Sequence, residues 1–502
     1  MSSDLLIWLS GFSLLYVVLL IMALRSQPSG PASQSNNLTE FFVSGRDLGL
    51  AKAVATLGAT EIGLITIAYN AQKGFNEGFA AFHIGIAAFV GCAIVGLTGF
   101  VVAPMRRTGV LTLPEYYGQR FGQDVRVLGA TIMALGGILN MGLFLKVASL
   151  FIIALLGVDA GSQSVTALMV VLVVIAVVYT CYGGMRSVIT TDVFQFVLMV
   201  VGIVAAIVFL LQVVPLQMAV EAVTQKKGDA GFNPLENENF GMTYVMWMVL
   251  VAGVVSSAIW PTALSRALCI EREENVPRAY LIASLVFAGR MILPAFLGVL
   301  AFAYFSGQAN PDASSLTAFG KDADLVATAV VLGEALPVWL AGFLAVAMFA
   351  SFMSTQDGYL FCWSSIISRD IVGPLTGKTE NANFQILATR VGIVLIAVYE
   401  LYWGLIYGGE EDIWDYLAVS GSIYFCSGIV LLAGGLYWKN ATRWGALLAL
   451  LGGFTAIAAL GPVKAALGLE AYSAPLIGFS AIAISLTGLV VGSIMERLVM
   501  PT

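Results

Sequence analysis

Long apolar stretches follow one another along nearly the whole chain, and short polar segments separate them. A helix needs about 20 mostly apolar residues to cross the hydrocarbon layer of a membrane. The ninth stretch, residues 327–367, is too long for one crossing, so we expect its ends to break or to run along the membrane surface. The pattern predicts thirteen membrane-spanning helices, at residues 5–24, 49–72, 78–104, 125–157, 162–182, 187–213, 240–268, 279–306, 327–367, 384–406, 412–437, 443–462 and 473–496.

The composition identifies lipid as the surroundings of this chain. Of the 502 residues, 59% are hydrophobic and 11% are charged, whereas an ordinary soluble domain carries about 25% charged residues. The net charge of −6 gives no sign of a nucleic-acid partner, and five scattered cysteines form no disulfide or zinc pattern. We therefore predict an all-α membrane protein with one transmembrane domain over residues 1–502, surrounded by a lipid bilayer and without an evident obligatory protein partner.

The charges at the ends of the apolar stretches predict the orientation. The first stretch lacks the basic start and the cleavage site of a signal peptide, because Asp4 precedes it and Arg25 follows it. We expect a retained helix. Most of the 24 lysines and arginines then fall on one side if the N-terminus lies outside, in accordance with the positive-inside rule. The prediction is an outside N-terminus and an inside C-terminus.

Two polar patterns interrupt apolar helices. In the second stretch Gly58 and Gly63 flank Glu61, and glycine weakens a helix. A broken helix there would free carbonyls for a cation, although small residues also serve as packing faces. In the ninth stretch Ser351, Ser354 and Thr355 share one helical face. Sodium prefers several oxygen ligands, but such hydroxyls often bond the preceding turn instead.

Among the ionisable residues within the predicted spans, five stand out, namely Glu61, Lys146, Asp192, Arg290 and His83. Charges at membrane depth are costly and usually functional. Asp192 lies near a span end and is also consistent with the inner interface, and Lys146 is also consistent with snorkelling. His83 is also consistent with a structural hydrogen bond.

Four motifs resemble the sodium/solute symporter family, which includes sugar, proline, choline and sialic acid transporters. They occupy residues 41–49 (FFVSGRDLG), 113–122 (LPEYYGQRFG), 183–195 (GGMRSVITTDVFQ) and 353–355 (MST), the last on a helix that ends at 368–370 (SRD). The resemblance implies a LeuT-type fold with a 5+5 inverted-repeat core. It divides the chain into an extra first helix at 1–30, a first repeat at 45–213, a second repeat at 240–437 and two extra helices at 438–502.

The same resemblance implies a sodium site, with Na+ as the coupling ion. Carbonyls of Ala59 and Ile62 and hydroxyls of Ser351, Ser354 and Thr355 match the family ligands. Asp192 matches an aspartate beside which some members bind a second ion.

The implied substrate cavity departs from the sugar transporters. The resemblance and the neighbouring sequence place Glu61, Thr66, His83, Ser256, Ser257, Trp260, Arg290 and Ala418 in it. Arg290 with His83 suits a carboxylate, and Glu61 with Trp260 suits an ammonium group. A charged or zwitterionic solute is therefore ranked first. An internal Glu61–Arg290 ion pair would instead favour a neutral solute such as a sugar.

The predicted function is sodium-coupled symport of a small polar solute by alternating access, in a bacterial inner membrane. A proton-coupled symporter is the nearest alternative, because Glu61 and His83 are titratable. A membrane sensor of transporter fold is a second alternative. An intramembrane enzyme is disfavoured, since the HExxH and GxSxG motifs are absent and the chain has one histidine.

Overall fold

The computed structural model describes residues 3–25, 38–159, 161–307, 314–407 and 413–499. Nearly all of these residues are helical and none forms a strand, which confirms the predicted all-α class. Within the predicted extra helix at 1–30, residues 26–30 lie outside the described residues, as does Asp412 at the start of the eleventh predicted stretch.

The helices are numbered in chain order. The first half contains α1 (Ser3–Arg25), α2 (Leu38–Val43), α3 (Leu50–Glu61), α4 (Leu64–Glu77), α5 (Phe82–Thr98), α6 (Val102–Thr108), α7 (Leu113–Phe121), α8 (Gln123–Met141), α9 (Phe144–Leu156), α10 (Ser162–Val213), α11 (Leu216–Lys227) and α12 (Gly241–Trp247). The second half contains α13 (Ser256–Ile259), α14 (Pro261–Cys269), α15 (Asn275–Ser306), α16 (Ser314–Thr317), α17 (Ala323–Ala335), α18 (Val338–Ile366), α19 (Gly373–Thr376), α20 (Ala382–Ile406), α21 (Ile413–Tyr437), α22 (Arg443–Phe454), α23 (Gly461–Ala466) and α24 (Ala474–Val499). Two π-helical segments, η5 (Met248–Val255) and η7 (Ile367–Val372), continue α12 and α18.

The helix α10 contains two apolar spans, Ser162–Cys181 and Val188–Val213. The hydroxyl of Tyr179 donates a hydrogen bond to the hydroxyl of Thr191. Residues twelve apart on a straight helix lie about 18 Å apart. The chain therefore reverses between the two spans, as two separate predicted stretches require.

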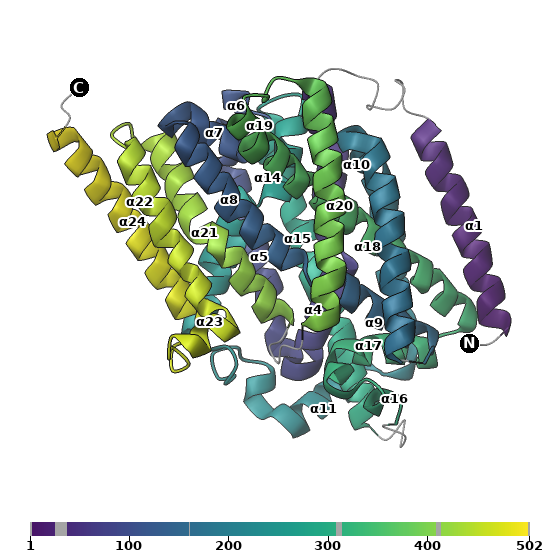
Figure 1. Ribbon diagram of the computed structural model, residues 1–502. Helices are drawn as coiled ribbons and strands as arrows, with labels where there is room; N and C mark the ends of the chain where they lie inside the picture. Colours follow the sequence, from purple (N-terminus) through teal and green to yellow (C-terminus); the bar gives the residue numbers. More distant parts are fainter. Residues whose placement is uncertain (1–2, 26–37, 160, 308–313, 408–412, 500–502) are drawn as a thin grey trace.

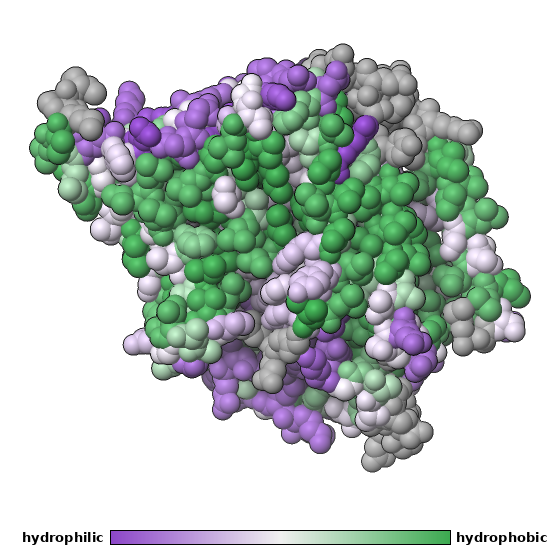
Figure 2. All heavy atoms as spheres, viewed as in Figure 1, coloured by the Kyte–Doolittle hydropathy of each residue, from purple (hydrophilic) through white to green (hydrophobic). Residues whose placement is uncertain are grey.

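The hydrophobic surface forms a band between two hydrophilic ends (Figure 2). Among the described residues, eleven helices are long and apolar enough to cross a membrane, and Arg443–Ala459 is a shorter apolar helix. The two chain ends lie on opposite faces (Figure 1), as an odd number of crossings requires. We name these the N-terminal face, where α1 begins, and the C-terminal face, where α24 ends. The count of thirteen crossings and their orientation stay predictions.

Close packing of small residues holds the central helices together. The helix α15 packs against α3, α4 and α5, and α18 packs against α10 and α20 (Figure 1). Gly74 lies so close to the carbonyl of Ala295 that a Cβ would come within 1.9 Å of its oxygen. The long ninth stretch is broken as expected, since Pro337 separates α17 from α18. This packing brings α3, α4, α14, α15 and α18 together at the centre.

Candidate functional site

The second predicted stretch is a broken helix. The helix α3 ends at Glu61 and α4 begins at Leu64, with Ile62 at φ −97° and ψ 65° and Gly63 extended. A Cβ on Gly63 would lie 2.3 Å from the Oγ1 of Thr355 on α18. Only glycine permits this approach, so the break and the hydroxyl-bearing helix are in direct contact.

A second break faces the first. Trp260, at φ −61° and ψ 120°, separates α13 from α14, and Pro261 begins α14, where its missing N–H costs nothing. The hydroxyl of Thr262 in this first turn donates to Oε1 of Glu61 at 2.6 Å. The positive end of the α14 dipole therefore lies against a carboxylate at the first break.

Hydroxyls of α18 meet carbonyls of the first break. Ser351 donates to the carbonyl of Ile62 at 2.8 Å, and Thr355 donates to the carbonyl of Thr60 at 3.0 Å. Sequence analysis did not single out Thr60. The carbonyl of Ala59 accepts the backbone N–H of Ile62 at 3.2 Å. Carbonyl and hydroxyl oxygens are the ligand types that a hard cation prefers.

The third hydroxyl of the predicted set points to Asp192. Ser354 donates to Oδ1 of Asp192 at 2.7 Å, while Thr56 and Thr60 donate to Oδ2 at 2.6 and 3.0 Å. Asp192 is fully buried. It therefore lies in the protein interior beside the first break, rather than at the inner interface.

Two charged residues to which the sequence analysis gave no role lie in the same region. The guanidinium of Arg266 is 3.5 Å from Oδ2 of Asp192, and both side chains have no solvent exposure. Asp357 on α18 is also fully buried, and neither of its carboxylate oxygens has a hydrogen-bond partner among the described residues. The charge of Asp357 within an apolar stretch could have marked it as a functional candidate in the sequence. No local pattern predicted the contact between Arg266 and Asp192.

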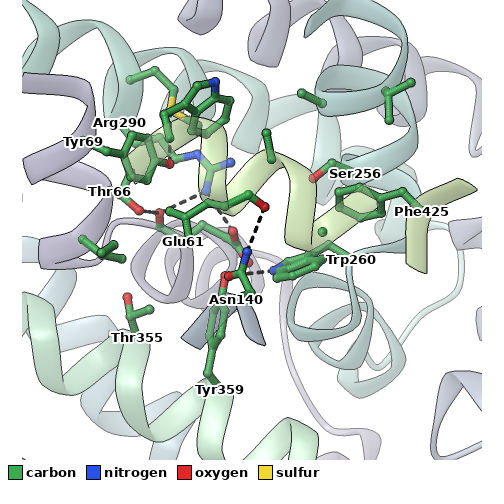
Figure 3. Close-up of a pocket in the computed structure, with 18 of the residues that line it drawn as sticks. Glu61, Thr66, Tyr69, Asn140, Ser256, Trp260, Arg290, Thr355, Tyr359 and Phe425 are labelled. Carbon is green, nitrogen blue, oxygen red and sulfur yellow. Dashed lines mark hydrogen bonds and ion pairs between the residues drawn. The ribbon is translucent and has the colours of Figure 1, made fainter. Parts of the chain in front are cut away.

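A cavity of about 100 Å³ lies beside both breaks (Figure 3). Seven aromatic and six polar residues line it, together with smaller apolar residues. The aromatic residues are Tyr69, Phe144, Trp247, Trp260, Tyr359, Trp414 and Phe425, and the polar ones include Glu61, Thr66, Asn140, Ser256, Arg290 and Thr355. Thr355 thus lines the cavity and also bonds the carbonyl of Thr60 at the break.

An ion pair crosses this cavity. The Nη1 of Arg290 lies 2.9 Å from Oε2 of Glu61 and donates to the Glu61 carbonyl at 3.0 Å (Figure 3). The side chains are 9% and 8% exposed, so each charge needs the other at this depth. The guanidinium stacks over Phe287 at 4.1 Å, and its Nε has no partner among the described residues.

Six of the eight predicted substrate residues line the cavity, namely Glu61, Thr66, Ser256, Trp260, Arg290 and Ala418. His83 and Ser257 are not among the lining residues. The Nδ1 of His83 lies 2.7 Å from the carbonyl of Ala80, and its ring packs on Phe240 at 4.5 Å. This is the structural alternative that the sequence analysis left open for His83.

Sequence reasoning missed most of the cavity wall. Tyr69, Trp414 and Phe425 stand in apolar stretches where an aromatic residue is unremarkable by hydropathy. Asn140 carried a polar signal within a span, and its amide donates to the carbonyl of Leu417 at 3.0 Å. The amide therefore ties α8 to α21 at the cavity.

The two faces close the cavity differently. At the N-terminal face a vestibule of about 580 Å³ is lined largely by polar residues, including Lys73 and Asp415. Tyr69 and Trp414, whose ring centroids lie 4.8 Å apart, line the cavity and are not among the residues that line the vestibule. At the C-terminal face, Arg126 pairs with Asp370 and Arg369 pairs with Glu115.

An all-helical membrane protein in which two broken helices meet at a buried polar cavity has the architecture of a secondary transporter. A sequence model of the sodium:solute symporter family matches residues 41–453. The chain belongs to this family.

Relatives of this chain at modest identity are transporters. The sodium/myo-inositol cotransporter of Mus musculus is 23% identical over 88% of this chain and 65% of the relative. The sodium/proline symporter of Haemophilus influenzae is 25% identical over 84% of this chain and 82% of the relative. The chain thus spans about 65% of the length of the myo-inositol cotransporters it matches.

Solved structures share the fold. A sodium-coupled sialic acid symporter in an outward-open state superposes with a TM-score of 0.78 at 17% identity, covering 98% of each chain. The nucleobase-cation-symport-1 family transporter Mhp1, in a closed conformation, gives a TM-score of 0.58 at 14% identity, covering 93% of this chain and 97% of its own. These neighbours confirm the predicted LeuT-type fold.

Proposed function

We propose that this protein couples the uptake of a small solute to sodium by alternating access, in the plasma membrane of a bacterium. One observation carries the proposal: hydroxyls of Ser351 and Thr355 converge on carbonyls that the first helix break releases. The proline symporters among its relatives are bacterial, which supports the inner-membrane location. Family membership supports sodium as the coupling ion.

Linkage between sodium and solute follows from shared groups. Thr355 lines the solute cavity and also contacts the first break. Sodium bound at the break would fix both α18 and the cavity wall in one arrangement. Solute that favours this arrangement then binds more tightly when sodium is present, and the reverse holds equally.

A small zwitterion suits the cavity best. The Glu61–Arg290 pair has no net charge, so a solute with no net charge adds no uncompensated charge at membrane depth. The Nε of Arg290 has no partner among the described residues, so its N–H can donate a hydrogen bond to a solute carboxylate. The ring of Trp260 offers a face for an ammonium group.

A neutral polyol is the second candidate. Glu61 and Arg290 already satisfy one another, with Thr262 completing the carboxylate. Asn140, Thr66 and Ser256 would then supply the hydrogen bonds. The relatives include both classes, since their names give myo-inositol and proline.

The sodium site is tested by uptake into proteoliposomes at varied sodium concentration. We expect Ser354→Ala and Thr355→Ala to raise the half-saturating sodium concentration about tenfold, which corresponds to about 1.4 kcal/mol. Ser364→Ala is the matched control, because this buried hydroxyl of α18 bonds the carbonyls of Leu360 and Phe361 in its own helix. Unchanged sodium affinity in both variants refutes the site, and uptake driven by a proton gradient without sodium supports the proton-coupled alternative.

The solute class is tested with proline, myo-inositol and sialic acid in competition assays. The double variant Glu61→Gln/Arg290→Met removes both charges without leaving one unpaired. We expect it to abolish zwitterion uptake. If the solute is a polyol, the double variant retains uptake while Arg290→Met alone loses it, because only the single change leaves a buried unpaired carboxylate.

A further inference from the structure

Glu400 is a further carboxylate at membrane depth, and it has no ion-pair partner among the described residues. Glu400 lies in α20, on a helix that is long and apolar enough to cross the membrane. Its side chain is fully buried, and so is that of Gln356 on α18. The Nε2 of Gln356 donates a hydrogen bond to Oε2 of Glu400. These two side chains connect α18 to α20.

The two remaining side-chain oxygens of this pair lack a hydrogen-bond donor among the described residues. Oε1 of Gln356 and Oε1 of Glu400 are both buried, and neither has a partner among the described residues. Both atoms are acceptors when Glu400 is ionised, and an unsatisfied buried acceptor costs about 1–3 kcal/mol. A carboxylic acid faces a carboxamide with one donor and one acceptor on each side. One proton on Oε1 of Glu400, donated to Oε1 of Gln356, satisfies both atoms at once.

The basic groups described on the neighbouring elements bind other partners, and the acidic groups there cannot neutralise Glu400. The helices α9, α10 and α18 and the segment η7 pack against α20. Among their titratable groups, Lys146 donates to the carbonyl of Tyr407, and Tyr179 bonds Thr191. Arg369 pairs with Glu115, and Asp370 pairs with Arg126. Asp357 on α18 is a further acidic group. On α20 itself Arg390 donates to the carbonyl of Cys181. An ionised Glu400 would thus be a bare charge in the membrane interior, which is expensive.

We propose that Glu400 and Gln356 form a proton-binding site that fastens α20 to α18. The bound proton makes Glu400 a neutral acid and completes a two-bond pair with the carboxamide. Removal of the proton leaves a carboxylate against the oxygen of Gln356, which repels it. Since Gln356 follows Thr355 directly, the clasp holds the helix that carries the three hydroxyls. This site is separate from the sodium ligands and stands independently of them.

Infrared difference spectroscopy tests the site directly. We expect the purified protein at neutral pH to show the carbonyl-stretching band of a protonated carboxylic acid, and Glu400→Gln to lose it. Glu400→Gln keeps the shape and two hydrogen bonds to Gln356, so the fold is expected to survive. Glu470→Gln, at an exposed carboxylate, is the control and should instead lose a carboxylate band. Loss of a carboxylate band in Glu400→Gln overturns the proposal.

A second variant and a second measurement protect the test. Gln356→Leu removes the carboxamide, and we expect the acid band to shift to the frequency of an acid without a hydrogen bond. A native state that holds one more proton than the unfolded state loses stability as pH rises. The melting temperature in detergent should therefore fall with pH between about 5 and 8 more steeply in the wild type than in Glu400→Gln. An unshifted band together with equal slopes contradicts the site.

Discussion

The two faces of the molecule close the central cavity by different means. At the C-terminal face Arg126 and Asp370 lie 2.7 Å apart with side chains 6% and 0% exposed. At the N-terminal face Lys73 and Asp415 lie 3.2 Å apart, and Asp415 is 43% exposed to a vestibule. The first pair is buried in the protein, and the second is half hydrated.

This difference indicates which face opens more readily. A buried ion pair is costly to break, because each charge is left without water or a partner. A half-exposed pair loses less, since water replaces the partner. The structure is therefore closed firmly at the C-terminal face and thinly at the N-terminal face, where the described residues include the Tyr69–Trp414 ring pair and the half-exposed Lys73–Asp415 ion pair.

Breaking the buried pair by removing Arg126 is expected to give the largest effect in this comparison. We expect Arg126→Ala to lower the free energy of unfolding by about 3–5 kcal/mol, because Asp370 would remain as an uncompensated buried charge. Arg126 also donates to the carbonyl of Arg369 at 3.1 Å, so the loss extends to the next ion pair. Denaturant titration in detergent measures the change.

An exposed ion pair on the same face gives the control. Arg443 and Asp124 lie 2.8 Å apart with side chains 54% and 39% exposed. Arg443→Ala should change the free energy of unfolding by at most about 1 kcal/mol. Equal losses in Arg126→Ala and Arg443→Ala would remove the physical basis for calling the C-terminal closure firm.

The thin closure predicts an intermediate effect. We expect Lys73→Met to cost about 1–2 kcal/mol, because Asp415 keeps its contact with water. The variant should also spend more time open at the N-terminal face. Labelling of a cysteine placed at Ala418, which lines the cavity, should be faster in Lys73→Met than in the parent. Slower labelling would mean that the pair holds the vestibule open rather than closed.

Local patterns predicted much of this architecture, and long-range contacts escaped them. The break at Glu61 follows from Gly58 and Gly63, and the apolar stretches follow from membrane thickness. Both depend on neighbouring residues alone. The approach of Gly63 to Thr355 depends on packing between helices nearly 300 residues apart, for which hydrophobic periodicity carries no information.

The charged residues show the same limit. Glu61 and Arg290 were predicted to lie in the cavity, and their pairing was left as one alternative. Arg266 and Asp370 lie near helix ends, where a charge usually faces water, so no local pattern predicted that both would be buried. Glu400 was overlooked, although a lone acid within an apolar stretch was a visible signal.

The smallest expected effect is a pH dependence of stability at Glu115, which pairs with Arg369 at the C-terminal face. Burial raises the pKa of Glu115, but Arg369 at 3.2 Å and the backbone N–H of Leu111 outweigh it and hold that pKa below its ordinary 4.5. A lowered pKa contributes stability above the unfolded-state value, and this is lost as pH falls through the folded value.

We therefore expect Glu115→Gln to be about 1 kcal/mol less stable than the wild type at neutral pH. The difference should shrink as pH falls below about 4.5, where the unfolded chain takes up the proton, and should vanish once the folded protein is protonated as well. Melting temperatures of both proteins across this range measure it, with the exposed Glu470→Gln as control. A stability difference that stays constant down to low pH would show that Glu115 stabilises the protein by its shape rather than by its charge. The ion pair of Glu115 with Arg369 would then not contribute to the closure of the C-terminal face.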